Sequence, residues 1–258
     1  MAVIHIDVCN MAIHFVRITE KDFLGRSLLH KYMPLENALR TLENRELWFS
    51  NPTIWQDPFE KRFILGTYDG KPFKWKNRVF CNCMTETATS EAYWNTYSQQ
   101  NIGISFAINR KQLLDELKTY QDQYDIFIGK AEYMQTKYIK YPLRKIKFQE
   151  PAPQYETPDF YARLLLLKRT AFKYEDEIRI MVLKKKPTSE KGITLKYNCQ
   201  NTDLIRTITL DPSLKEYTLK LFKDIFVSKY HFVPQGTIQR VQQSSLYKTQ
   251  PAEKIPIN

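Results

Sequence analysis

Glycine is scarce in this sequence, at 7 of 258 residues. Folds that hold phosphates with glycine-rich loops need several glycines at fixed spacing, and the chain contains no G-x-G-x-x-G. The stretch 66–72 resembles a phosphate loop, but it is one residue short and ends in Pro72 where a hydroxyl side chain is required. We therefore expect neither a Rossmann-type dinucleotide site nor a P-loop.

Cysteine and histidine are also rare, with four of each. The cysteines form no Cys-x-x-Cys pair, and four in a chain of this length do not make the disulfide framework of a small secreted protein. Reduced thiols, and hence a cytoplasmic location, are expected. Because H-E-x-x-H and G-x-S-x-G are both absent, we expect no metal and no triad hydrolase.

Long apolar runs are missing too, and none approaches the roughly 20 residues that a membrane-spanning helix needs. What the chain does have is positive charge, with a formal net charge of +11. Such an excess attracts polyanions and speeds encounter with them. The composition therefore favours a soluble protein with a nucleic-acid or nucleotide partner and no membrane partner.

Hydrophobic periodicity predicts helices mixed with short strands along the chain. The proline-rich stretch 149–153 is the clearest break between successive elements. This mixture is typical of an α+β fold with mainly antiparallel pairing and flanking helices. We expect helices over 35–46, 90–100, 110–120, 157–168 and 212–221, and strands over 47–50, 78–84, 102–108, 175–183, 205–210, 224–228 and 238–242.

The most informative stretch is 174–179, with the sequence Y-E-D-E-I-R. Successive strand residues point to opposite faces, so Glu175, Glu177 and Arg179 are expected to share one face of a strand. Two interpretations remain open. The face is either exposed, with Arg179 neutralising the acids, or it is the floor of a cleft where a carboxylate meets a developing positive charge.

A second group of residues lies earlier in the chain, where a strand end at 48–50 leads into a polar turn flanked by aromatic residues. Trp48, Trp55 and Phe59 can stack on a flat ligand or anchor the core. The segment His30-Lys31-Tyr32 ends the strand before the first predicted helix.

Several motifs resemble those of a widespread bacterial family of unknown function. In chain order they are Lys31-Tyr32, Phe49-Ser50, Gln56-Asp57-Pro58-Phe59-Glu60, Cys83-Met84-Thr85-Glu86, Trp94 with Tyr97, Gly103-Ile104-Ser105-Phe106, Tyr174-Glu175-Asp176-Glu177-Ile178-Arg179 and Ser244-Ser245-Leu246-Tyr247. The resemblance covers about Leu29 to Tyr247. It implies a single domain over 29–258, preceded by an N-terminal strand or leader over 1–28.

This layout resembles, more distantly, the ADP-ribosyltransferase superfamily of toxins. The resemblance implies split, mainly antiparallel sheets and an NAD-dependent ADP-ribosyltransferase that serves as a bacterial toxin or phage-defence effector. Its catalytic residues would be Glu177, which stabilises the oxocarbenium-like transition state, Glu175, which accepts the proton of the nucleophile, and Tyr32, which stacks on nicotinamide. The residues implied for binding NAD, as substrate, are His30, Lys31, Ser50, Asn51, Trp55 and Asp57.

The acceptor is expected to be nucleic acid, with RNA favoured, or a protein, and an antitoxin or chaperone is a further expected partner. Between 133 and 148 lysines and arginines are interleaved with aromatic rings, a pattern that suits single-stranded nucleic acid but also a solvated basic surface. The candidate contacts are Lys137, Lys140, Tyr141, Arg144, Lys145 and Lys147.

Two other classes of function remain open. One is a nucleic-acid-binding module without catalysis, in which the basic segment matters and Glu177 does not. The other is a nuclease, in which Asp57, Glu60, Glu175 and Glu177 gather a divalent metal ion.

Overall fold

The computed structural model describes residues 13–26, 28–65, 67–68, 71–98, 102–135 and 157–248. Ten strands in these ranges form one sheet. They are β1 (Ile13–Val16), β2 (Leu28–Pro34), β3 (Glu46–Ser50), β6 (Val79–Thr85), β7 (Gly103–Asn109), β8 (Tyr124–Lys130), β11 (Glu177–Lys184), β12 (Gly192–Lys196), β13 (Ile205–Leu210) and β14 (Val241–Gln243). Two small two-stranded sheets pair β4 (Thr67–Tyr68) with β5 (Lys71–Pro72) and β9 (Glu132–Met134) with β10 (Leu167–Arg169).

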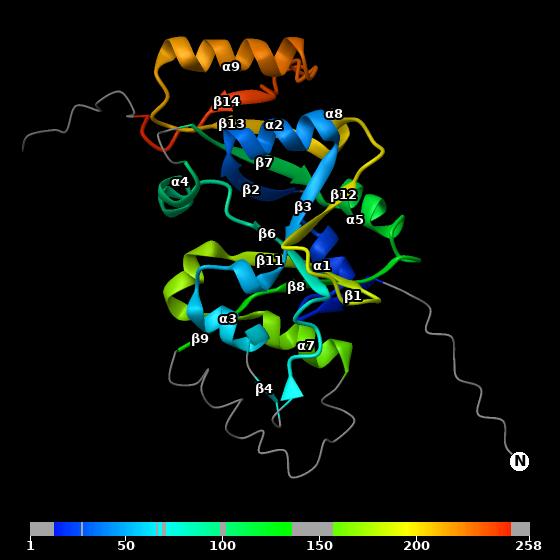
Figure 1. Cartoon of the computed structure of the whole chain (residues 1–258). Coiled ribbons are helices and arrows are strands. Elements are labelled where there is room, and N and C mark those ends of the chain that lie inside the picture. Colours follow the sequence, from blue (N-terminus) through cyan, green and yellow to red (C-terminus); the bar gives the residue numbers. More distant parts are fainter. Residues whose placement is uncertain are drawn as a thin grey trace, which may run out of the picture.

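Helices flank the main sheet (Figure 1). They are α1 (Glu20–Leu24), α2 (Leu35–Asn44), α3 (Pro58–Leu65), α4 (Glu91–Tyr97), α5 (Arg110–Lys118), α7 (Pro158–Leu165), α8 (Asn201–Leu204) and α9 (Glu216–Ser228), with 3₁₀ turns η1 (Pro52–Ile54) and η4 (Thr170–Glu175). No helix in the described ranges combines the length and apolar character needed to cross a membrane.

The main sheet forks at β6. One edge of β6 pairs with β11 along its length. The other edge meets β2 only at the His30–Thr85 pair and β3 only at the Ser50–Cys81 pair. One arm of the fork continues through β2, β7, β13 and β14, and the other through β3 and β12. Most pairings are antiparallel, while β1 with β8 and β13 with β14 are parallel. The expected α+β class with largely antiparallel pairing and flanking helices is confirmed.

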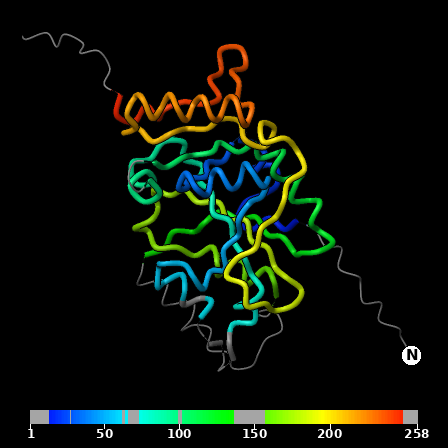
Figure 2. The backbone as a smooth tube through the Cα atoms, turned by 45° about the horizontal axis from the view of Figure 1, so that its top comes forward, coloured from blue at the N-terminus to red at the C-terminus, as the bar shows by residue number. Residues whose placement is uncertain are grey.

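Two cores form on opposite sides of the sheet. On β11, Ile178 and Ile180 join the larger core, while Met181 and Leu183 join the smaller one beneath α3 and α7. This alternation is the strand periodicity that the sequence predicts. In Figure 2, α9 lies across one end of the molecule and the α3 segment lies at the other.

Residues 13–26, which belong to the segment predicted to precede the domain, pack against the same cores. Strand β1 adds to the edge of β8, and Val16 and Phe23 are fully buried. Helix α1 begins with a capping box, in which the side chains of Thr19 and Asp22 each accept the other residue's backbone N–H.

The structure departs from the predicted elements most clearly at two places. The helix predicted over 157–168 ends at Leu165, and Leu167–Arg169 form the strand β10. The sequence predicts a helix over 212–221 and a strand over 224–228, but the structure has the single helix α9 from Glu216 to Ser228. The β-branched Ile225 and Val227 favour a strand locally. Leu219, Phe222 and Phe226, however, recur at helical spacing and pack on the larger core, and tertiary packing decides the outcome.

Candidate active site at the fork of the sheet

The two glutamates of the Glu-x-Glu motif do not lie on one strand as predicted. Glu175 ends the 3₁₀ turn η4, and Glu177 begins β11. Between them Asp176 adopts a left-handed backbone with φ of 38°. Its carbonyl accepts the Glu86 N–H at 3.1 Å, and its carboxylate pairs with Lys130 at 2.9 Å. This turn, rather than strand alternation, aims both glutamates at the same cation.

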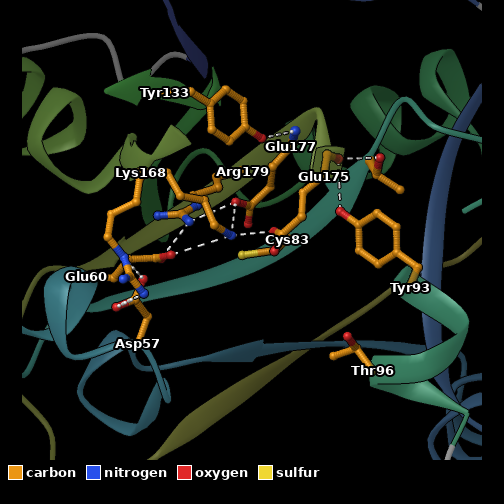
Figure 3. A network of polar contacts seen from close by, with 12 residues as sticks. Asp57, Glu60, Cys83, Tyr93, Thr96, Tyr133, Lys168, Glu175, Glu177 and Arg179 are labelled. Atoms are coloured by element: carbon orange, nitrogen blue, oxygen red, sulfur yellow. Dashed lines mark hydrogen bonds and ion pairs between the residues drawn. The ribbon is translucent and has the colours of Figure 1, made fainter. Parts of the chain in front are cut away.

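That cation is Lys168, on β10. Its ammonium donates to Glu177 Oε2 at 2.9 Å and to Glu175 Oε2, and it lies 3.5 Å from Glu60 Oε1. Figure 3 shows these carboxylates gathered around the lysine from three different elements. The Lys168 side chain is only 8% exposed, so the ion pairs are little screened by water. Burial opposes the charged form, but the ion pairs with the glutamates raise the pKa of Lys168 above its usual value.

Arg179 forms the second cationic centre. Its guanidinium donates to Glu60 at 2.6 Å, to Glu177 Oε2 at 2.8 Å and to the carbonyl of Leu165, and it lies 4.6 Å from the ring centre of Trp55. Arg179 therefore does neutralise an acid of the motif, but on a buried face rather than an exposed one. Its exposed fraction is 1%.

The two motif glutamates have opposite pKa shifts. Burial would raise the pKa of Glu177, but Arg179 and Lys168 outweigh it and hold the pKa well below the usual range. Burial raises the pKa of Glu175, and the nearby Glu177 charge raises it further. Lys168 lowers this pKa but does not offset the two other effects. At neutral pH Glu177 is thus the permanently charged member, and Glu175 is the one nearer to exchanging a proton.

Two tyrosine hydroxyls fix the backbone of the motif. The Tyr133 hydroxyl accepts the N–H of Glu177 at 2.9 Å, and the Tyr93 hydroxyl donates to the carbonyl of Glu175 at 2.9 Å. Tyr133 lies on β9 and Tyr93 on α4, so two separate elements hold the turn between the glutamates from opposite sides (Figure 3).

Lys31 connects this cluster to the fork. From β2 its ammonium donates to the carbonyl of Cys83 on β6 at 2.6 Å. Cys83 lies between Thr85, which pairs with β2, and Cys81, which pairs with β3. Burial of the ammonium lowers the pKa of Lys31, while the Glu177 carboxylate acts in the opposite direction. Cys83 also pairs in register with Arg179, so Lys31 approaches the cluster through the split in the sheet.

A cavity of about 390 Å³ opens in this fork. Both arms contribute to its walls, and so do α2 and the end of α4. Its lining residues include Lys31, Arg40, Trp48, Asn82 and Tyr97. Burial raises the pKa of the Tyr97 hydroxyl, and Cys83, Glu175 and Glu177 reinforce the shift. Tyr97 therefore links the cavity electrostatically to the two glutamates.

The neighbours of Lys31, His30 and Tyr32, have their contacts outside the acidic cluster, although Tyr32 also lines the fork cavity. His30 lines a different cavity, between β2, β13, β14 and α9, where burial and Arg110 lower its pKa to about 4. Tyr32 is buried with its ring stacked on Tyr93 at 4.8 Å, and its hydroxyl donates to the carbonyl of Ala88. Burial raises the pKa of Tyr32 to about 12. Of the three, Lys31 is the one whose pKa is affected by the Glu177 carboxylate.

The remaining residues expected to bind NAD lie between the end of β3 and the start of α3, and none of them lines the fork cavity. Ser50 accepts the indole N–H of Trp55 at 3.2 Å, and the Trp55 ring lies against Arg179. Asn51 is buried, where it caps η1 and donates to the carbonyl of Lys76. Asp57 accepts the Phe59 N–H and pairs with Arg169 at 3.2 Å.

Asp57 thus has its own cation and does not join Glu60, Glu175 and Glu177. Within the described residues, no group of three or more histidine, cysteine, aspartate or glutamate side chains is arranged to hold a metal ion. The basic residues expected to contact nucleic acid, Lys137, Lys140, Tyr141, Arg144, Lys145 and Lys147, lie outside the described residues.

Sequence reasoning missed Lys168, which binds all three carboxylates of the cluster. A signal was present, because this lysine directly follows four leucines at 164–167. A charged residue that ends an apolar run is expected to be buried together with a counter-charge. Tyr133 carries no comparable signal, since its role depends on β9 lying beside the start of β11.

A family model described as protein of unknown function (DUF2971) matches residues 93–180. The matched segment contains Tyr93, Lys168, Glu175, Glu177 and Arg179, so it includes most of the buried ion network. No curated protein and no solved structure matches the chain. The expected resemblance to a family of unknown function is thus supported over this segment.

Proposed function

We propose that this protein is an NAD-dependent ADP-ribosyltransferase whose catalytic pair is Glu177 and Glu175. The observation that carries the proposal is the opposite pKa shift of these two carboxylates, which one lysine holds together beside the fork of the sheet. Pairs of titratable groups with divergent pKa values mark acid–base assignments in enzyme sites.

The chemistry uses the two glutamates differently. Breaking the bond between ribose C1′ and the nicotinamide nitrogen leaves its electron pair on nicotinamide, which becomes neutral, and positive charge develops at C1′. An ionised carboxylate stabilises that charge, and Glu177 remains ionised at any physiological pH. The acceptor then forms its bond to C1′ and loses a proton, which Glu175 takes up as general base.

The remaining support comes from the fork. Split antiparallel sheets with an early basic residue, a middle serine and a late Glu-x-Glu are the layout that the resemblance implies. Here Lys31 on one arm and Ser50 on the other flank β6, and Glu177 lies on the neighbouring strand. In this proposal Lys31 holds the pyrophosphate, because its ammonium lies within the fork, between β2 and β6.

The proposed acceptor is a polyanion, with RNA favoured, in keeping with the net charge of +11. ADP-ribosylation of RNA by a toxin or defence effector would block the function of the RNA. The alternative acceptor is a protein, and comparing RNA with cell extract as acceptor distinguishes the two.

The test is to incubate the protein with NAD alone, with NAD and RNA, and with NAD and a cell extract. The molecular masses of the products are then measured. Transfer adds one ADP-ribosyl group to the acceptor and releases one nicotinamide. A nuclease would instead shorten RNA in a metal-dependent way without NAD, and a binding module would leave every mass unchanged. Either of the last two results overturns the proposal.

A further inference from the structure

A second cavity, the His30 cavity, lies on the other face of the sheet from the fork. Its volume of about 450 Å³ falls within the range of small-molecule pockets. On β2 and β7, Lys31 and Phe106 line the fork cavity, whereas their neighbours His30 and Ala107 line the His30 cavity. Because successive strand residues point to opposite faces, the sheet itself separates the two cavities. The proposed reaction takes place at the fork, so the His30 cavity has no assigned ligand.

The sheet side of the His30 cavity carries polar groups that have no partner. His30 on β2 pairs with Ala107 on β7, and Ala107 pairs with Thr207 on β13, so the short alanine side chain leaves room between the two polar residues. Thr209, two residues further along β13, lines the same cavity. Among the described residues, the side chains of His30, Thr207 and Thr209 have no hydrogen-bond partner, and their polar atoms are not among the unpaired ones that are closed off from solvent. These atoms are therefore free to bond a ligand that enters the cavity.

Thr207 reaches this face through an irregularity in β13. Residues two apart on a regular strand share a face, yet Ile205 lines the fork cavity and Thr207 lines the His30 cavity. The register of β13 against β7 shifts between these two residues. The buried guanidinium of Arg240 holds this stretch by donating to the carbonyls of Ile205 and Arg206 at 2.8 and 3.0 Å. Shifts of this kind re-aim side chains, and this one turns Thr207 to the face that carries His30.

The charge of the His30 cavity is positive. Lys223 on α9 and Lys248 beyond β14 line it, while no aspartate or glutamate is among the described residues that do so. Neither lysine forms a salt bridge with a described residue. His30 is neutral at pH 7, because burial and the nearby Arg110 lower its pKa to about 4. Its imidazole thus offers one donor and one acceptor, and the two lysines supply the charge.

We propose that the His30 cavity binds a phosphorylated sugar, whose phosphate pairs with Lys223 and Lys248 while its hydroxyls bond to the polar groups on the sheet. A phosphate has enough charge and enough acceptor oxygens to engage two ammonium groups at once. Sugar hydroxyls both donate and accept, which matches threonine hydroxyls and a neutral imidazole. A free sugar phosphate and the ribose 5′-phosphate of a mononucleotide share this chemistry. Such binding is independent of NAD cleavage at the fork.

The test is calorimetric titration of the full chain with ribose 5-phosphate, ribose, inorganic phosphate and adenosine 5′-monophosphate. Ribose 5-phosphate should bind at least about tenfold more tightly than ribose, because hydrogen bonds to a charged group are the stronger ones. It should also bind more tightly than inorganic phosphate, which lacks the sugar hydroxyls. Tighter binding of the mononucleotide than of ribose 5-phosphate identifies a nucleotide as the source, and equal or weaker binding identifies a free sugar phosphate.

Three variants separate the contributions of charge and hydroxyl groups. Lys223→Gln should lower the affinity ratio of ribose 5-phosphate to ribose, whereas Lys220→Gln, which removes the same charge from an exposed position on α9 outside the cavity, should not. Thr207→Val keeps the shape of the side chain and should weaken both sugars by roughly threefold to tenfold without changing their ratio. Because each ratio compares two ligands on one variant, partial loss of folded protein does not mimic the result.

A spectroscopic readout places the ligand in this cavity rather than at the fork. The ring signals of His30 in the NMR spectrum, assigned by their loss in His30→Asn, should shift when ribose 5-phosphate is added. The inference is overturned if these signals do not move, or if ribose 5-phosphate binds no more tightly than ribose or inorganic phosphate. It is also overturned if Lys223→Gln keeps the wild-type ratio or if Lys220→Gln lowers the ratio equally.

Discussion

Replacing Arg179 with methionine is the sharpest perturbation of the buried ion network. Methionine keeps an apolar stem against Trp55 but removes the three hydrogen bonds of the guanidinium to Glu60, Glu177 and the Leu165 carbonyl. The variant then has the buried carboxylates of Glu60 and Glu177 and the partly buried one of Glu175 around the single cation Lys168. Breaking a buried ion pair by removing one partner costs about 3–5 kcal/mol. At about 2–4 °C per kcal/mol for a chain of this size, the melting temperature should fall by about 6–20 °C.

The loss should also depend on pH. In the wild type the pKa of Glu177 is depressed on folding, so its contribution to stability is present above the unfolded value of 4.5 and is lost as pH falls toward the folded pKa. Without Arg179 the pKa of Glu177 rises, and protonation then relieves the unpaired charge. The difference in unfolding free energy between wild type and Arg179→Met should therefore shrink as pH falls from 7 to 5.

Denaturant unfolding at several pH values measures both effects. The matched control is Arg163→Met, which breaks the exposed pair between Arg163 and Asp159 on α7. Exposed pairs of this spacing contribute about 0.3–0.5 kcal/mol. Equal, small losses for the two variants, or a loss at Arg179 that does not change with pH, would refute the description of the cluster as a buried, mutually dependent network.

Three further predictions follow from single positions. Asp176→Val places a β-branched residue at a φ of 38° and should cost about 1–2 kcal/mol in a thermal melt, while Asp176→Asn should stay within about 0.5 kcal/mol of the wild type; equal melts would contradict the left-handed turn. Gly192→Ala should displace the indole of Trp48 and change the tryptophan emission spectrum, which an unchanged spectrum would disprove. In the proposed reaction Glu175 is the general base, and its pKa is raised, so transferase activity should increase as pH rises through that pKa and Glu175→Gln should lose this acidic limb; a limb that persists would assign it to another group.

Local pattern predicted much of the fold. The alternation on β11 placed Ile178 and Ile180 in one core and Arg179 on the opposite face, and the structure has this arrangement. Asparagine is a favoured N-cap residue, and the Asn109 side chain accepts the Gln112 N–H at the start of α5. Such features depend on residues close together in sequence, which is why they are readable there.

The features that make the site depend on distant contacts. The left-handed turn at Asp176 is held by Lys130 and by the Glu86 N–H, and neither contact is visible in the Glu-x-Glu pattern. The fork exists because β6 exchanges partners between β2 and β3, a long-range pairing that no local period encodes. The opposite pKa shifts of the two glutamates follow from those contacts, so they emerge only from the folded chain.

Release of nicotinamide from NAD tests the central claim most directly. It should be measured for the wild type, for Glu177→Gln and for a control, Glu190→Gln, whose carboxylate is exposed and paired with Lys184. With RNA or cell extract as acceptor, we predict release by the wild type and by Glu190→Gln. For Glu177→Gln, checked to melt cooperatively, the rate of release should be lower by a factor of about 100 or more. No release by the wild type with any acceptor, or wild-type release by Glu177→Gln, would contradict the assignment of this fork as an ADP-ribosyltransferase site.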